Sequence, residues 1–299
     1  MRKVLLFVCL LMAGMTVNVN AAKQKAKHVI LIGMDGWGAY SVPKADIPAI
    51  KSLMTNGCYT LHSRSVLPSS SAINWASMFM GVGTELHGYT TWGSKTPEIP
   101  SREVNERGIA PTIFSVLREQ RPKAEIGCLY EWPGIKYLVD TLAMSYQYQT
   151  PGYAKAPTAL CEAAEKYIIE KKPELLAICF EEPDHTGHTK GHDTPAYYQM
   201  LKELDGYVER ILQAIKKAGI WDDTIIIMTA DHGGIETGHG GKTLREMEIP
   251  FIISGKNVRK GMEIKESMMQ YDVASTIAYI FGLKQPQVWI GRPMKQVFK

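Results

Sequence analysis

The chain has 299 residues, of which 45% are hydrophobic and 21% are charged, as is typical of a folded globular protein. Its formal net charge of +4 is small, and no run of Lys and Arg exceeds two residues, so the basic footprint of a nucleic-acid-binding protein is excluded. The length admits one large domain or two small ones.

The N-terminus has the pattern of an export signal. A basic start at Met1-Arg2-Lys3 precedes the apolar run VLLFVCLLMAGM, and small residues lie near Ala21. The run ends before Thr16, short of the roughly 20 apolar residues that a transmembrane helix needs. We expect a signal peptide over residues 1–21, a periplasmic or secreted location, and a mature chain without a membrane span. Residues 22–299 are expected to form a single domain.

Short apolar runs rich in β-branched residues then alternate with longer segments of helical period. Strands are predicted at 28–36, 124–130, 174–180, 224–231 and 249–255. Helices are predicted at 72–81, 111–120, 158–172 and 195–219, and the segment from 93 to 112, rich in Pro, Arg and Glu, predicts a long surface loop. The alternation predicts an α/β fold, a three-layer sandwich with a mostly parallel central sheet.

Carboxylate and imidazole side chains follow three of the predicted strands. They are Asp35 after the first strand, Asp184 and His188 after the third, and Asp231, His232 and His239 after the fourth. A single Asp after a strand is usually a turn residue or a helix cap. Because the carboxyl ends of parallel strands meet at one edge of the sheet, three such strands predict a shared site instead.

Mixed carboxylate and imidazole ligands suit Zn²⁺ best, with Mn²⁺ as the alternative, whereas Mg²⁺ and Ca²⁺ favour oxygen ligands. Six ligands are too many for one catalytic zinc ion, which takes about three protein ligands. They fit two metal ions that bind the same substrate and hold the attacking and leaving oxygens of an in-line phosphoryl displacement. The four cysteines after residue 21 show no CxxC spacing, which argues against a thiolate zinc site.

Such a site needs a nucleophile, and the segment VLPSSSAINWASMFMG at 66–81 offers three adjacent serines before a predicted helix. A serine there can cap the helix. It can also act as the nucleophile, because the free N–H groups at a helix N-terminus favour a phosphate. Ser69, Ser70 and Ser71 are all candidates on this ground, and neighbouring serines can serve both purposes.

The motifs GMDG, PSSSAIN, HG, WPG, PDHTGH, ADHGG and GHGG follow one another in this order along the chain. In this respect the sequence resembles the alkaline phosphatase superfamily, and within it the type I phosphodiesterase/nucleotide pyrophosphatase branch. The resemblance runs from the first strand to the helix-like segment MQYDVASTIAYIFGL at 269–283. It implies an alkaline-phosphatase-like fold.

The resemblance also implies roles for individual residues. The branch has its nucleophile three residues before an Asn and about sixteen before a His-Gly pair, and Ser71 meets both spacings, with Asn74 and with His87. One zinc ion would take Asp184, His188 and His239. The other would take Asp35, Asp231 and His232 and would bind Ser71 Oγ.

Two positions depart from the pattern of the branch. Trp92 occupies the place of an Asn that contacts a phosphate oxygen, and Thr90, Thr91 or backbone amides are the available substitutes. His239 follows His232 by seven residues, where the branch has a long insertion, which implies a smaller fold with less covering the site.

Four residues are expected to contact the substrate: Asn74, Trp92, Trp132 and Lys242. Trp132 follows a strand and is a candidate wall for the leaving-group pocket, where an aromatic ring would favour nucleotide-like or aryl diesters. Lys242 could reach a phosphate oxygen, although an exposed loop lysine is the ordinary interpretation. His185 and His192 are interpreted as surface-loop residues.

The main hypothesis is an exported two-zinc phosphoesterase that hydrolyses phosphodiester or pyrophosphate bonds of a small-molecule ester through a phosphoserine intermediate. The alternative is a phosphomonoesterase or phosphonate hydrolase on the same scaffold. A non-catalytic metal- or glycan-binding module is a third interpretation. A sulfatase is disfavoured because the chain lacks the C/S-x-P-x-R motif. The sequence does not define the oligomeric state.

Overall fold

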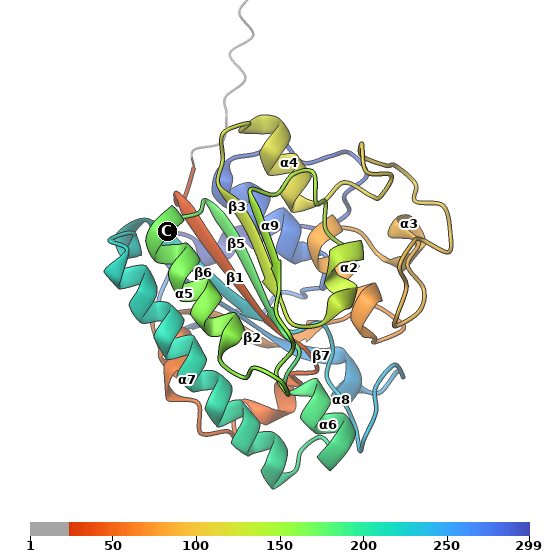
Figure 1. Ribbon diagram of the computed structural model, residues 1–299, viewed down its shortest axis with the longest axis vertical. Coiled ribbons are helices and arrows are strands. Elements are labelled where there is room, and N and C mark those ends of the chain that lie inside the picture. Colours follow the sequence, from red (N-terminus) through yellow and green to blue (C-terminus); the bar gives the residue numbers. More distant parts are fainter. Residues whose placement is uncertain (1–23) are drawn as a thin grey trace, which may run out of the picture.

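A central eight-stranded sheet organises the computed structural model, which describes residues 24–299 (Figure 1). The predicted signal peptide at 1–21 lies outside the described residues. The strand order is β4-β3-β5-β1-β6-β7-β2-β8. The strands are β1 His28–Met34, β2 Gly57–Arg64, β3 Ile126–Tyr130, β4 Tyr146–Gln149, β5 Leu175–Phe180, β6 Thr224–Thr229, β7 Glu248–Gly255 and β8 Met262–Glu263.

Five neighbouring strands, from β4 to β6, pair in parallel, and β7 runs antiparallel to both β6 and β2. The central strands β5 and β6 are buried along their whole length, which explains their nearly continuous apolar sequences. The prediction of a mostly parallel sheet is therefore confirmed.

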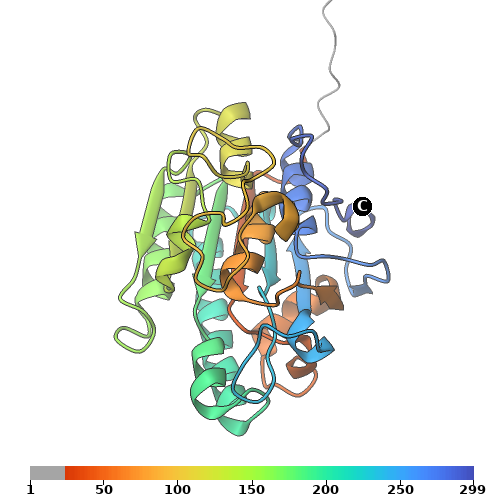
Figure 2. The same ribbon diagram turned by 90° about the vertical axis from the view of Figure 1, so that its right-hand side faces the viewer.

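Helices cover both faces of this sheet, so the molecule has three layers (Figures 1 and 2). One face packs against α2 (Ser71–Met80), α4 (Ile113–Gln120) and α9 (Asp272–Phe281), and the other against α1 (Pro48–Thr55), α5 (Ala159–Lys171) and α7 (Pro195–Lys217). Side chains alternate along each strand, so Leu31 of β1 enters the first core and Ile32 enters the second. Burial on both faces holds the central strands, and the loops at their ends, in place.

Three shorter helices lie in the connections: α3 (Thr84–His87), α6 (Asp184–Lys190) and α8 (Leu244–Met247). Between α3 and α4 the described chain forms neither helix nor strand, which confirms the loop predicted at 93–112. Within residues 24–299, no helix is long and apolar enough to cross a bilayer. All four cysteines of the described chain are buried free thiols.

Candidate metal centre and active site

The most buried part of the candidate site lies at the carboxyl ends of β1 and β6. These strands pair in parallel with Gly33 opposite Thr229, and Asp35 and Asp231 each lie two residues beyond that pair. His232 Nε2 lies 3.3 Å from Asp35 Oδ1 and 3.3 Å from Asp231 Oδ2. We call Asp35, Asp231 and His232, whose side chains are all buried, the buried half of the centre.

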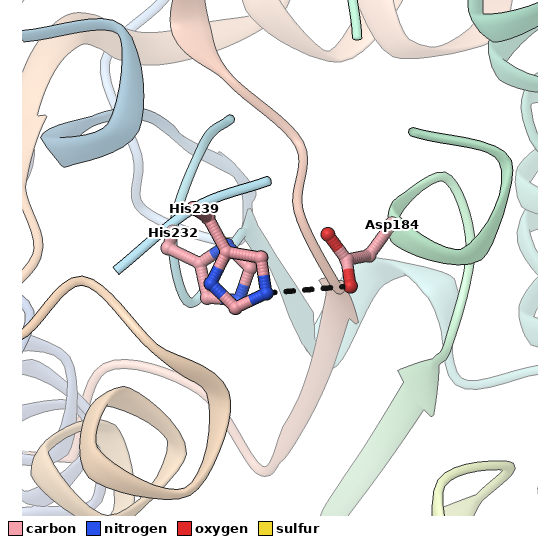
Figure 3. Close-up of side chains that lie close together, drawn as sticks. All are labelled: Asp184, His232 and His239. Carbon is pink, nitrogen blue, oxygen red and sulfur yellow. Dashed lines mark ion pairs between the residues drawn. The ribbon is translucent and has the colours of Figure 1, made fainter. Parts of the chain in front are cut away.

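A second cluster adjoins it and is more accessible. Asp184 is the first residue of α6, and His188 follows one turn later, with its Nε2 3.0 Å from Asp184 Oδ2. His239 comes from the loop after β6, and its Nε2 lies 3.7 Å from the same oxygen (Figure 3). We call Asp184, His188 and His239 the open half. The rings of His232 and His239 stack with centroids 3.7 Å apart, so the two halves are contiguous.

The backbone brings α6 against the end of β1. The amide of Asp184 donates a hydrogen bond of 3.0 Å to the carbonyl of Asp35. This approach requires a glycine at position 36, where φ is +68° and a Cβ would lie 2.5 Å from Asp184 Oδ1. The Gly36 amide in turn donates to Asp231 Oδ1 at 3.1 Å. The GMDG motif therefore supplies the ligand candidate Asp35 and, at Gly36, the space that Asp184 occupies.

The three histidines present the same nitrogen to the centre. Nδ1 of His188 lies 2.8 Å from the Thr237 carbonyl, and Nδ1 of His232 lies 2.8 Å from the Gly233 carbonyl. Nδ1 of His239 lies 3.1 Å from the Ser69 carbonyl. Because a carbonyl only accepts, each Nδ1 is the donor, and Nε2 is left to face the cluster. Histidine ligands of metals are commonly oriented in this way.

Three buried carboxylate oxygens in the centre have no hydrogen-bond partner among the described residues: Asp35 Oδ1, Asp184 Oδ1 and Asp231 Oδ2. Burial, followed by the nearby Asp231 and Asp184 charges, raises the pKa of Asp35 well above its usual value. Burial and Asp184 raise the pKa of Asp231 in the same direction. Because unpaired buried carboxylates are costly, these oxygens fit a site for cations, and the mixed donor set fits zinc.

The histidine pKa values separate the two halves. The hydrogen bond that His188 Nε2 donates to the Asp184 carboxylate is the main cause that raises the pKa of His188 to about 9. Burial acts to raise the pKa of Asp184, but His188 and the nearby His232 and His239 outweigh it and hold that pKa below its usual range. Burial, together with His239, lowers the pKa of His232 to about 3. In the metal-free protein the open half thus contains an ion pair, whereas the imidazole of the buried half is neutral.

Ser71 is the serine that faces the centre. It is the first residue of α2, and its Oγ lies 3.2 Å from His232 Nε2. Ser70 occupies the N-cap position without a side-chain capping bond, and Ser69 Oγ donates to the Gly241 carbonyl. The structure therefore places Ser71 beside the buried half and gives Ser69 a role in joining two loops.

Ser71 opens into a cavity of about 260 Å³. Its lining combines residues of both halves with side chains from the surrounding loops. They are Asp35, Ser71, Trp92, Trp132, Glu181, Asp184, His185, His188 and His239. The two tryptophans expected at the substrate site thus lie on its wall.

Two other expected substrate contacts are not in this lining. Asn74 is fully buried: its Oδ1 accepts from the Val66 amide, and its Nδ2 donates to the carbonyls of Val66, Pro68 and Ser70. All the hydrogen bonds of its side-chain amide are made with the loop that carries the serines. Lys242 is exposed and lies outside the lining. The expectation of substrate contact is corrected for Asn74, and for Lys242 it stays a prediction.

Of the two histidines interpreted as surface-loop residues, His185 is exposed as expected, whereas His192 is buried. His185 lines the cavity. His192 is buried against Gly187 and Gly234, with its Nε2 3.7 Å from Asp184 Oδ1 and no hydrogen-bond partner for either ring nitrogen among the described residues. The spacing of PDHTGHTKGH could not show this, because the burial of His192 depends on the loop after β6.

Sequence reasoning also missed two glutamates near the cavity. Glu181 directly follows β5 and lines the cavity, and its amide donates to Glu131 Oε2 at 2.9 Å. Glu131 follows β3 and is buried, and this burial raises its pKa to about 8. Both glutamates are carboxylates at the end of a strand, as the candidate aspartates are, but neither is among the residues selected from sequence.

Comparisons with known proteins identify the family of the chain. A model of the type I phosphodiesterase / nucleotide pyrophosphatase family matches residues 29–261. Mouse bis(5'-adenosyl)-triphosphatase enpp4 is 24% identical over 226 residues, which cover 72% of this chain and 48% of that protein. The chain spans about half the length of the bis(5'-adenosyl)-triphosphatases it matches.

Solved structures share the fold at low identity. An inactive variant of murine ectonucleotide pyrophosphatase / phosphodiesterase 5 in complex with AMP has a TM-score of 0.74 and 17% identity, covering 93% of this chain and 100% of that chain. A 2-O GAG sulfatase has a TM-score of 0.72 and 14% identity, covering 91% of this chain and 74% of that one. The expected alkaline-phosphatase-like fold is thus confirmed, and the chain belongs to the type I phosphodiesterase / nucleotide pyrophosphatase family.

Proposed function

We propose that this chain is an exported phosphoesterase that hydrolyses phosphodiester or pyrophosphate bonds of small molecules, using two zinc ions and a phosphoserine intermediate. Residues 22–299 form its single domain. The observation that carries the proposal is the position of Ser71, at the N-terminus of α2 and 3.2 Å from His232 Nε2. A hydroxyl at that point adjoins both a set of metal-ligand candidates and a helix terminus that favours phosphate.

Each half of the centre would hold one zinc ion. Asp184, His188 and His239 form one ligand set, and Asp35, Asp231 and His232 form the other, together with Ser71 Oγ. Bound zinc would supply positive charge to the attacking and leaving oxygens and lower the pKa of the groups it binds.

Ser71 Oγ loses its proton to water and attacks phosphorus in line with the leaving oxygen, so the bond from phosphorus to Oγ forms as the ester or anhydride bond breaks. The leaving oxygen takes up a proton from water. A water molecule then attacks the phosphoserine, the bond to Oγ breaks, and Ser71 regains its proton. Two in-line displacements give net retention of configuration at phosphorus.

The charges around the cavity favour diesters over monoesters. A monoester dianion needs extra positive charge at its nonbridging oxygens. Among the described residues that line the cavity there is no Lys or Arg, and Lys242 lies outside the lining. This supports a monoanionic diester as the substrate and argues against the phosphomonoesterase alternative.

The Ser71→Ala variant tests the proposal. With zinc bound, turnover of bis(p-nitrophenyl) phosphate should fall by about 10⁴-fold or more, because the covalent route is lost. Wild-type protein quenched during turnover should carry a p-nitrophenyl phosphoryl group on Ser71, and a chiral phosphorothioate diester should react with retention. Wild-type turnover by a zinc-loaded Ser71→Ala protein would refute the nucleophile. Fewer than two zinc ions per chain, with no activity after zinc addition, would favour a non-catalytic module.

A further inference from the structure

A glycine-rich loop connects the two halves of the candidate metal centre. It begins after His232 of the buried half, contains His239 of the open half and leads into α8. Five of the nine residues from 233 to 241 are glycines. Because glycine leaves the backbone many conformations, contacts from outside this loop are needed to hold His239 in one position.

Glu246 of α8 contacts the loop near both of its ends. Its carbonyl accepts a hydrogen bond of 2.8 Å from the amide of Gly233, the residue after His232. Its carboxylate oxygen Oε1 accepts a hydrogen bond of 2.7 Å from the amide of Gly241, two residues after His239. A single residue therefore joins the segment that leaves the buried half to the segment that follows the open half.

Two glycines of the loop are required by the closeness of α8. A Cβ at Gly241 would lie 2.6 Å from Glu246 Oε1, and a Cβ at Gly233 would lie 2.1 Å from the carbonyl oxygen of Arg245. Neither glycine has a positive φ, so close approach and not backbone conformation explains them. The ADHGG and GHGG motifs thus contain the glycines that allow α8 to contact the loop.

Gly241 is linked to His239 by a second route. Ser69 Oγ donates to the Gly241 carbonyl at 2.7 Å, and the Ser69 carbonyl lies 3.1 Å from His239 Nδ1. Gly241 is therefore bonded through its amide to Glu246 and through its carbonyl to the serine that orients the His239 ring. Groups that orient a metal-binding histidine in this way strengthen metal binding.

Glu246 also has an ordinary structural role as part of a capping box. Its Oε2 accepts from the Thr243 amide at 3.1 Å and from Thr243 Oγ1 at 2.6 Å, and the Thr243 side chain accepts from the Glu246 amide. These bonds begin α8. The cap uses Oε2, whereas the contact with Gly241 uses Oε1, so substitutions can separate the two roles.

We propose that Glu246 is a positioning residue for His239 and, through it, for the zinc ion of the open half. It ligates no metal in our assignment and acts by holding Gly241. This inference rests on the proposed two-zinc function and adds a residue outside the six ligand candidates and outside the cavity lining.

Zinc affinity, measured separately for the two ions by competition with a chromophoric chelator, tests this role. In Glu246→Ala the open half should bind zinc about tenfold more weakly, a usual loss for a residue that orients a ligand. The buried half should keep its affinity, because the bond to Gly233 comes from the backbone of Glu246. The affinity that His188→Ala weakens identifies the open half.

Gly241→Ala breaks the same contact from the other side. Its Cβ displaces Glu246 Oε1 and leaves the capping bonds of Oε2 in place, so α8 keeps its cap. This variant should show the same loss at the open half, and it tests the proposal even if Glu246→Ala does not fold.

Thr243→Ala is the matched control. It removes the capping hydroxyl of α8 and leaves Glu246 Oε1 able to accept from Gly241. Like Glu246→Ala, it should lower the free energy of unfolding of the metal-free protein, but both zinc affinities should stay as in the wild type.

An unchanged affinity of the open half in Glu246→Ala or in Gly241→Ala would overturn the proposal. An equal loss in Thr243→Ala would also overturn it and assign the effect to the cap of α8, and an equal loss at both ions would indicate a general collapse of the loop. Each of these results leaves the proposed phosphoesterase function standing. A wild-type chain that binds fewer than two zinc ions would instead refute the proposed function itself.

Discussion

The two halves of the candidate metal centre are carried by different structural elements. The buried half follows β1 and β6, adjacent parallel strands in the middle of the sheet, and its side chains are almost inaccessible. The open half is carried by the short helix α6 and by a glycine-rich loop, and the His188 side chain is 44% exposed. The nucleophile candidate Ser71 lies beside the buried half.

This difference has a physical consequence for metal binding. In the buried half, solvent replaces a missing ligand less readily, because the side chains are almost inaccessible. In the open half, water can take the place of a lost imidazole. We therefore expect the buried half to determine whether the enzyme works at all, and the open half to determine how readily its zinc ion exchanges.

The largest effect should come from the buried half. Asp231→Asn should remove one zinc ion and lower kcat/KM on a diester by on the order of 10⁴-fold, because the remaining ligands are too few for a buried cation. Metal analysis and steady-state kinetics measure both. Asp222→Asn, an exposed change at the other end of β6, is the matched control and should bind two zinc ions.

The same variant separates metal binding from folding. Burial raises the pKa of Asp231, so removing its charge should leave the metal-free protein at least as stable as the wild type. Denaturation in the presence of a chelator tests this. A two-zinc Asp231→Asn protein with wild-type kinetics would show that Asp231 is not a ligand.

A smaller effect is expected in the open half. His188→Ala should lower kcat/KM by on the order of 10²-fold at low zinc, and excess zinc should restore most of the activity, because water can complete the ligand set. Titration of activity with zinc measures the recovery. If excess zinc also rescued Asp231→Asn, the contrast between the two halves would be lost.

A still smaller effect should come from His192, which packs behind Asp184 and ligates nothing in our assignment. His192→Leu should weaken zinc binding at the open half by about tenfold, a usual size for a residue that orients a ligand. Competition with a chromophoric chelator would measure the two affinities separately. An equal loss at both ions would indicate a general packing defect rather than support of Asp184.

The smallest expected effect is a change of stability with pH in the metal-free protein. The folded-state pKa of His188 is about 9, above the ordinary value of 6.5. Its pairing with Asp184 therefore stabilises the fold fully below about pH 6.5, and this contribution is lost as the pH rises through about 9. The difference in the free energy of unfolding between wild type and His188→Ala should shrink across this range in urea titrations. A difference independent of pH would contradict the ion pair.

The strands of the fold follow from local sequence. Runs such as HVILIGM and TIIIMT are apolar throughout because both faces of a central parallel strand are buried, and all five predicted strands form. The strand β2 and the helix α1 were not predicted. Residues of β2 alternate between buried and exposed positions with polar side chains among them, and α1 is only eight residues long. Their placement depends on packing against β7 and α7.

The order of chemical groups along the chain was enough to select six ligand candidates, because parallel strands end at the same edge of a sheet. The structure brings all six together. Sequence could not distinguish a side chain that faces the cavity from one that faces the backbone. Asn74 matches a family spacing yet bonds only to its own loop, whereas Glu181 matches no motif and lines the cavity.

The sequence by itself therefore determined the α/β class, the family and the edge of the sheet where the candidate site lies, since these depend on period and on the order of residues. Only the tertiary structure decided which half of the centre is buried, that Ser71 rather than Ser69 or Ser70 faces it, and that Glu181 and two tryptophans line the cavity. Those features depend on contacts between segments far apart in the chain, such as that of Ser71 with His232. Local sequence does not show which distant segments come into contact.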